Sequence, residues 1–141
     1  MRKFAFVLSV VLGVSSLPVR ADIVGAKQFA DQYAAHVKGI DPAYKLTADA
    51  GRAFYVKKYL SKGKEESCSS CHTDNPANQG KHSETGKPIQ PLSPAVNMKR
   101  FSNLQEVEKN FAKHCRDILG RDCTPQEKGD YITYLLTVQK P

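Results

Sequence analysis

Apolar residues recur every three or four positions in several stretches of the chain, the spacing that gathers side chains on one face of an α-helix. The first stretch covers residues 24–40 and stops before Asp41-Pro42. Its apolar positions are Phe29, Tyr33, Val37 and Ile40. A second helix is expected from the N-cap residue Thr47 to Leu60, and Gly51 within it predicts a close contact with another helix. Its apolar positions are Ala50, Ala53, Phe54 and Val56.

Two more helices are predicted in the last third of the chain. Residues 102–105, Ser-Asn-Leu-Gln, fit a capping box that opens a helix ending near Arg116. Residues 124–127, Thr-Pro-Gln-Glu, combine an N-cap, a proline at the first helical position and a capping-box glutamate. The apolar face of the first helix is Leu104, Val107 and Phe111, continued by His114. That of the second is Tyr131, Ile132, Leu135, Leu136 and Val138.

The N-terminal segment follows another pattern. Arg2 and Lys3 precede an apolar run from Phe4 to Leu12, and the small residue Ala21 closes the segment. This arrangement is typical of a secretory signal peptide, and the apolar run is too short to span a bilayer. We expect residues 1–21 to be cleaved and residues 22–141 to form one periplasmic domain that does not span a membrane. In that oxidising compartment spare cysteines pair.

The segment Cys68-Ser69-Ser70-Cys71-His72 is the attachment signature of c-type haem. Two cysteines three residues apart lie on one side of a helical turn, so both sulfurs can form thioethers with one porphyrin edge. The adjacent histidine can then bind the iron. A thioredoxin-like dithiol would need a βαβ context, and a zinc site would need a second pair of ligands at a different spacing. One covalent haem c is therefore the expected cofactor.

Residues 73–100 contain four prolines and few apolar residues, and predict a long connection without regular structure. Such connections are uncommon unless they are functional, and a haem would supply the apolar core that this one lacks. Met98 is a weak candidate for the second iron ligand, because methionine is a frequent ligand in cytochromes. His82 lies among polar residues and is expected to be exposed.

His114 admits two interpretations. A histidine on an inward-facing helix stripe is ordinarily hydrogen-bonded in the core, but in a haem protein it is also well placed to bind the iron opposite His72. Cys115 and Cys123 are the two remaining cysteines of an exported chain, so we expect them to form a disulfide, with free thiols or redox exchange as the alternatives. That bond would limit where the neighbouring imidazole can go.

The charge of the chain is mildly basic. Without Arg2, Lys3 and Arg20, the domain holds 18 Lys and Arg against 14 Asp and Glu. The lysines are scattered and there is no Trp, which argues against nucleic-acid binding. Redox partner proteins are expected, some with an acidic docking face. We expect a monomer.

Three segments carry a family resemblance: residues 68–78, residues 86–92 and, most specifically, residues 114–125, His-Cys-Arg-Asp-Ile-Leu-Gly-Arg-Asp-Cys-Thr-Pro. They resemble the cytochrome c″ and sphaeroides haem protein family of c-type cytochromes, from about Gly51 to Leu136. The resemblance implies an all-α, class I-like fold of four to five helices around one haem. It also implies His72 as proximal ligand, His114 as distal ligand and a disulfide between Cys115 and Cys123. The sphaeroides branch has asparagine at the distal position, so the histidine points to the bis-histidine branch.

The family also implies a distal ligand that leaves the iron. Our interpretation is a periplasmic electron carrier, not an enzyme, whose His114 detaches on reduction and takes up a proton. The alternative is a protein that binds a small gas such as oxygen or nitric oxide at the vacated position, as a sensor or enzyme. A third possibility is a bis-histidine carrier without ligand switching.

Overall fold

Five helices make up most of the structure, a computed structural model that describes residues 21–139. They are α1 (Ala21–Lys38), α2 (Ala48–Val56), α3 (Cys68–His72), α4 (Leu104–Leu119) and α5 (Pro125–Thr137). Two small antiparallel sheets accompany them, β1 (Tyr59–Ser61) with β2 (Lys64–Glu66), and β3 (Gly80–Lys81) with β4 (Pro88–Ile89). The expected helical class is confirmed, and the strands are a minor addition. Of the predicted signal peptide, all but Ala21 lies outside the described residues.

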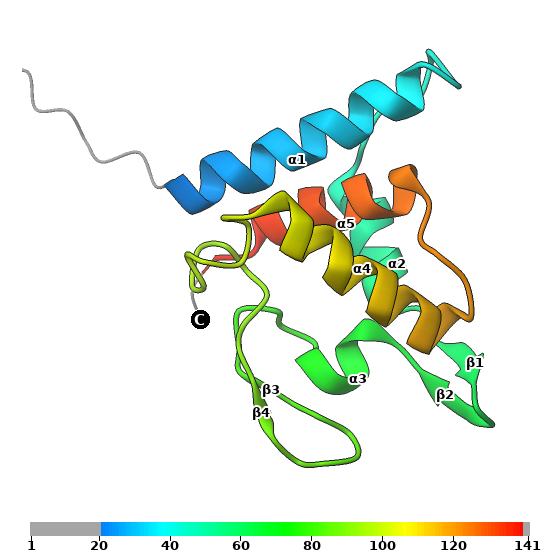
Figure 1. Cartoon of the computed structure of the whole chain (residues 1–141), viewed down its shortest axis with the longest axis vertical. Coiled ribbons are helices and arrows are strands. Elements are labelled where there is room, and N and C mark those ends of the chain that lie inside the picture. The colour runs from blue at the N-terminus through cyan, green and yellow to red at the C-terminus, as the bar shows by residue number, and fades with distance from the viewer. Residues whose placement is uncertain (1–20, 140–141) are drawn as a thin grey trace, which may run out of the picture.

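Helix α5 is the centre of the packing. It contacts both α1 and α2, and its residues Ile132 and Leu135 are fully buried. At the crossing of α2 and α5, a Cβ on Gly51 would overlap the Asp130 carbonyl oxygen, which confirms the predicted close contact. Figure 1 shows α1 lying across α4 and α5, with α3 and the two small sheets on the opposite side of these helices. The buried core lies among α1, α2, α4 and α5, which supply most of its residues.

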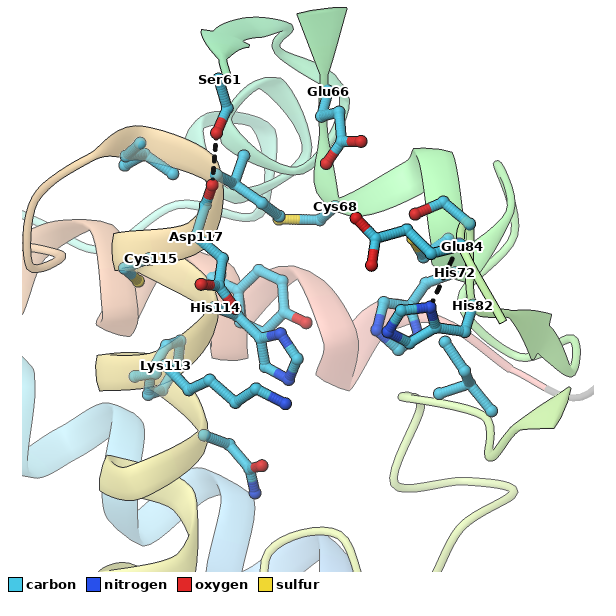
Figure 2. Close-up of a pocket in the computed structure, with 18 of the residues that line it drawn as sticks. Ser61, Glu66, Cys68, His72, His82, Glu84, Lys113, His114, Cys115 and Asp117 are labelled. Atoms are coloured by element: carbon cyan, nitrogen blue, oxygen red, sulfur yellow. Dashed lines mark hydrogen bonds between the residues drawn. The ribbon is translucent and has the colours of Figure 1, made fainter. Parts of the chain in front are cut away.

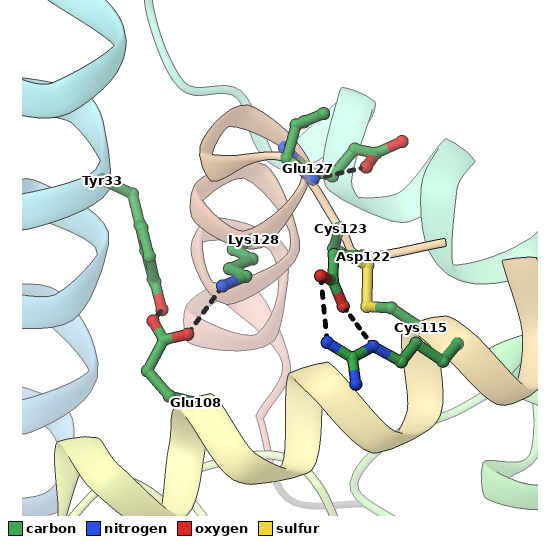
Figure 3. Close-up of polar contacts among 9 residues, drawn as sticks. Tyr33, Glu108, Cys115, Asp122, Cys123, Glu127 and Lys128 are labelled. Atoms are coloured by element: carbon green, nitrogen blue, oxygen red, sulfur yellow. Dashed lines mark hydrogen bonds and ion pairs between the residues drawn. A yellow bond between two sulfur atoms is a disulfide. The ribbon is translucent and has the colours of Figure 1, made fainter. Parts of the chain in front are cut away.

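Polar contacts fix α1 and α4 against α5. Glu108 on α4 accepts hydrogen bonds from the Tyr33 hydroxyl of α1 and, at 2.6 Å, from the Lys128 ammonium of α5 (Figure 3). A second carboxylate, the buried Asp130, accepts from the Tyr44 hydroxyl and from the backbone N–H of Thr47 at 2.7 Å. Each carboxylate joins segments distant in sequence, and loss of a donor to the buried Asp130 would leave its carboxylate unsatisfied.

Helix boundaries differ from the predictions where local signals compete. Helix α1 ends at Lys38, so Ile40 lies in the following turn and is 77% exposed. Helix α2 ends at Val56 and buries Gly51 and Tyr55, whereas the predicted positions Ala50, Ala53 and Val56 are exposed. The chain continues from there into the β1–β2 hairpin, whose turn residues Lys62 and Gly63 both have positive φ.

The caps of the last two helices give opposite outcomes. Helix α4 is capped by Asn103 and not by Ser102, because the Asn103 side chain accepts from the N–H groups of Gln105 and Glu106. Helix α5 has the predicted N-cap, first-position proline and capping box. Its buried face contains the predicted Tyr131, Ile132 and Leu135 together with Gly129, Asp130 and Tyr134, while Leu136 and Val138 are partly buried. No helix among residues 21–139 is long and apolar enough to cross a membrane.

Candidate functional site

A cavity of about 300 Å³ lies between α3 and α4, and the four haem-site residues predicted from the sequence line it. Its wall includes Cys68, Cys71, His72 and His114. The β1–β2 hairpin, the connection between α3 and α4, and Tyr131 of α5 also line it. Figure 2 shows His72 and His114 on opposite sides of the space, with both rings directed into it. Its volume lies at the lower end of the range of about 300–1,000 Å³ that is typical of cofactor sites.

Helix α3 presents the two thiols. Ser67 caps it and forms a capping box with Ser70, which holds this single turn in place. Cys68 and Cys71 are free and half-buried. Burial raises the pKa of Cys68 to about 11, so its sulfur is a protonated thiol at neutral pH. The turn therefore offers two unpaired thiols to whatever occupies the cavity.

His72 is held from behind by Tyr55 of α2. The fully buried Tyr55 hydroxyl donates to the carbonyl oxygens of His72 and Thr73, at 3.1 and 2.5 Å. Thr73 has a φ of 62°, a conformation that costs energy in a β-branched residue. Burial, followed by the charge of Arg100 and the proximity of His114, lowers the pKa of His72 to about 4. Its ring is therefore neutral at neutral pH, as an iron ligand must be.

His114 lies in the second half of α4, beside the buried stripe. That stripe consists of Val107, Phe111 and Cys115, so the prediction that the imidazole continues it is wrong by one position. The side chain of His114 is instead exposed to the open cavity. The surrounding chain and the nearby positive charges of Lys113 and Arg100 lower its pKa, against the charge of Asp117. It too is favoured in the neutral form.

Three contacts immobilise the end of α4 that carries His114. Cys115 and Cys123 form a disulfide with 5.6 Å between their Cα atoms (Figure 3). The Arg116 guanidinium pairs with Asp122 at 2.7 and 3.2 Å across the same loop. Ser61 of β1 donates to the Asp117 carbonyl oxygen at 2.5 Å. The backbone that presents His114 is therefore attached to the loop between α4 and α5 and to the hairpin, independently of the cavity's contents.

Met98, the other candidate ligand, lies apart from this arrangement, whereas the exposed His82 does not. Met98 is 59% exposed and does not line the cavity. His82 is exposed as predicted, and its Nδ1 accepts from the N–H groups of Glu84 and Thr85. It nevertheless lies at the cavity wall near His72 (Figure 2).

Other wall residues carried no sequence signal. Arg100 and Tyr131 line the cavity, as do Lys62 and Lys64 of the hairpin. Arg100 is one lysine or arginine among 21, and Tyr131 is part of an ordinary apolar stripe. Their position follows from how the long connection and α5 fold back against α3, which sequence spacing does not reveal.

The residues of the cavity fit a c-type haem. Two thiols lie on one wall, and neutral imidazoles face each other across it. His72 Nδ1 and Arg100 Nε are buried without a hydrogen-bond partner in the described part of the chain, so the pocket is chemically incomplete. Among residues 21–139, no group of three or more His, Cys, Asp and Glu side chains could hold a metal ion by themselves.

Comparisons with known proteins agree on one group. Residues 42–135 match a family model described as a domain of unknown function, DUF1924. The chain is 46% identical to cytochrome c″ of Methylophilus methylotrophus over 86% of its length and 85% of that protein. It is 37% identical to the cytochrome c-type protein SHP of Cereibacter sphaeroides over 70% of its length and 78% of that protein.

The solved structures give the same result. The crystal structure of oxidised cytochrome c″ from M. methylotrophus superposes with a TM-score of 0.80, at 45% identity, covering 84% of this chain and 98% of that one. A solution structure of the same protein, described in terms of haem-ligand detachment, gives 0.77 with the same identity and coverage. Oxidised SHP, described as an oxygen-binding cytochrome c, gives 0.68 at 32% identity, covering 78% and 94%.

Proposed function

Since the chain belongs to the family of c-type cytochromes that contains cytochrome c″ and SHP, whose haem is covalently bound, we propose that it carries single electrons in the periplasm. The observation that carries this proposal is the pair of neutral imidazoles, His72 and His114, that face one cavity from opposite sides. Attached there, haem supplies an iron that exchanges one electron between its ferric and ferrous states.

Each site residue has a distinct part in this proposal. Cys68 and Cys71 hold the haem through thioethers, and their shared helical turn sets its edge against α3. His72 would be the proximal ligand, and the Tyr55 hydroxyl holds its carbonyl oxygen. His114 would be the distal ligand in the ferric state, presented by α4. Residues 1–21 direct export, and redox proteins with an acidic docking face are the expected partners.

The separate attachment of the elements that carry His72 and His114 supports detachment of His114 on reduction. His72 and His114 lie on different elements, and each element is tied separately, α3 to α2 by Tyr55 and α4 by the disulfide and Ser61. Ferrous iron carries one positive charge less and binds a constrained imidazole more weakly. His114 would then be the imidazole that comes free, while the Tyr55 hydroxyl keeps the backbone of His72 in place. The description of the Methylophilus relative in terms of haem-ligand detachment supports this.

A detached His114 can take up a proton as the electron arrives. While bound, its coordinating nitrogen has no free lone pair. Once free in the pocket, the ring titrates below its usual value of about 6.5, because burial and the charges of Lys113 and Arg100 lower its pKa. Proton uptake is therefore expected in mildly acid solution and weakens toward neutral pH.

The ligand set is tested by spectroscopy on the purified protein. A pyridine haemochrome spectrum that reports two saturated vinyl groups would support attachment at both Cys68 and Cys71. Wild-type ferric protein is expected to be six-coordinate and low-spin, and His114→Ala to lose this state. Met98→Leu serves as the matched control, and a His114→Ala protein with an unchanged ferric spectrum would refute the distal assignment.

Gas binding is the second candidate, favoured by the relative described as an oxygen-binding cytochrome c. Release of His114 would leave the sixth position of the iron facing an open cavity. Spectra of the reduced protein with and without added carbon monoxide, nitric oxide or oxygen distinguish the two. Absence of a spectral change favours a plain electron carrier, whereas rapid turnover of the bound gas favours a sensor or enzyme.

A further inference from the structure

Arg100 holds a fixed position at the edge of the haem cavity. It lies between the long connection and α4, directly before Phe101, which is 2% exposed and packs on Phe29 of α1 with 6.5 Å between ring centroids. The Arg100 guanidinium carbon lies 5.8 Å from the centroid of the Phe101 ring. The neighbouring Lys99 is exposed and lies outside the cavity wall. Burial of Phe101 therefore directs the Arg100 side chain, and not Lys99, toward the cavity.

The positive charge of Arg100 reaches both sides of the cavity. It lines the same cavity as His72 of α3 and His114 of α4, and it forms a hydrogen bond with the buried Tyr131 of α5. Arg100 Nε is buried, and none of the ion pairs among residues 21–139 includes this guanidinium. The half-buried Arg100 thus has an unsatisfied buried N–H and no carboxylate beside it in the described part of the chain, so a counter-charge is expected when the cavity is filled.

Haem brings two carboxylates, on its propionate side chains. A guanidinium matches a carboxylate in charge and in hydrogen-bonding geometry, since two parallel N–H groups can donate to the two oxygens. We propose that Arg100 is a haem-binding residue that pairs with a propionate carboxylate inside the cavity, next to the Tyr131 hydroxyl. This inference rests on the haem attachment at Cys68 and Cys71 proposed above. It assigns a role to a half-buried cation of the cavity wall that thioether formation and iron ligation leave unused.

Lys113 is the strongest competitor for the same carboxylate. Its side chain extends toward the cavity in Figure 2, and it also lines the wall. It differs from Arg100 in being exposed, so its ammonium keeps its water without a partner. An exposed ion pair of this kind contributes little. Variants of Arg100 and of Lys113 therefore show which of the two cations pairs with the propionate.

The test uses oxidised holoprotein of wild type and of Arg100→Gln, Arg100→Lys, Lys99→Gln and Lys113→Gln. Pyridine haemochrome spectra first establish that haem is attached in each, which separates failure of this inference from failure of the haem site. Resonance Raman spectroscopy then follows the propionate bending band, which responds to hydrogen bonding of the carboxylate. We expect a shift in Arg100→Gln, a smaller one in Arg100→Lys, and none in Lys99→Gln or Lys113→Gln.

The reduction potential gives a second readout. Removing a cation near the iron favours the ferric state, so the potential of Arg100→Gln should be lower than that of wild type by more than Lys99→Gln lowers it. A propionate band unchanged in Arg100→Gln, or shifted in Lys113→Gln instead, overturns the proposal. If Arg100→Gln yields no holoprotein, a crystal structure of wild-type holoprotein decides the question. A guanidinium nitrogen within about 3.2 Å of a propionate oxygen is expected, and a side chain turned to solvent refutes it.

Discussion

The disulfide that follows His114 should stabilise the fold by restricting the unfolded chain. Cys115 and Cys123 are eight residues apart in the sequence. For a closed loop of this size, the chain-entropy relation gives about 2.5 kcal/mol at 25 °C. Changing both residues to Ala is expected to reduce the free energy of unfolding by about this amount. The native loop should keep its shape, because Arg116 still pairs with Asp122 and Arg121 with Glu127.

Guanidinium chloride unfolding of the oxidised holoprotein, followed by far-ultraviolet circular dichroism, measures this change. The double variant should unfold at lower denaturant concentration and with a steeper dependence on it, because its unfolded chain is more expanded. Asp122→Ala is the matched control, since it removes an exposed ion pair from the same loop and should have a much smaller effect. A loss below about 0.5 kcal/mol in the double variant would refute the argument from unfolded-chain entropy.

Two further predictions concern the contacts behind the site. Tyr55→Phe removes the hydroxyl that donates to the His72 and Thr73 carbonyl oxygens, so it should reduce the free energy of unfolding by about 1–2 kcal/mol. It should also alter the ferric electron paramagnetic resonance spectrum. Tyr44→Phe removes a hydroxyl remote from the cavity and should leave that spectrum unchanged. Burial raises the pKa of Glu108, but hydrogen bonds from Lys128 and Tyr33 outweigh it and leave the pKa below its usual value. A depressed folded pKa adds stability above the unfolded value of about 4.3, and that stability is lost as the pH falls through the folded pKa. The unfolding temperature of wild type should therefore fall more steeply below about pH 4.5 than that of Glu108→Gln, and parallel curves would contradict the role given to this carboxylate.

Capping motifs in the sequence predicted where a helix begins when residues at that end alone determine it. Helix α5 begins as expected because Thr124 and Glu127 cap it without help from the rest of the chain. For α4, two good capping residues stand side by side, and the actual cap is Asn103, whose side chain accepts two backbone N–H groups. The sequence pattern could not rank Ser102 against Asn103, because both types are favoured at this position.

The elements that were missed depend on long-range packing. The second helix was expected to reach Leu60, but the chain turns at Lys57 and forms the β1–β2 hairpin, in which Leu60 is 79% exposed. Apolar spacing favoured a longer helix because it cannot tell an exposed apolar residue from a buried one. The same limit placed His114 in the buried stripe of α4, although its side chain lines the cavity.

The site was predictable to the extent that its chemistry lies in short motifs. Cys68, Cys71 and His72 share one helical turn, and His114 lies directly before one of the two remaining cysteines. Tyr55 and Arg100 could not be found in this way. Tyr55 reaches the site only because Gly51 lets α2 approach α5 closely, and Arg100 only because Phe101 is buried beneath α1.

A spectroscopic redox titration at several pH values, on wild type and His114→Ala, tests the central claim most directly. If reduction releases His114, the wild-type potential should fall by up to about 59 mV per pH unit in acid solution and level off above about pH 6.5. His114→Ala should lack this component, and reduced wild type should have lost its sixth ligand. A potential equally dependent on pH in both proteins, with a reduced wild type that stays six-coordinate, would contradict the account.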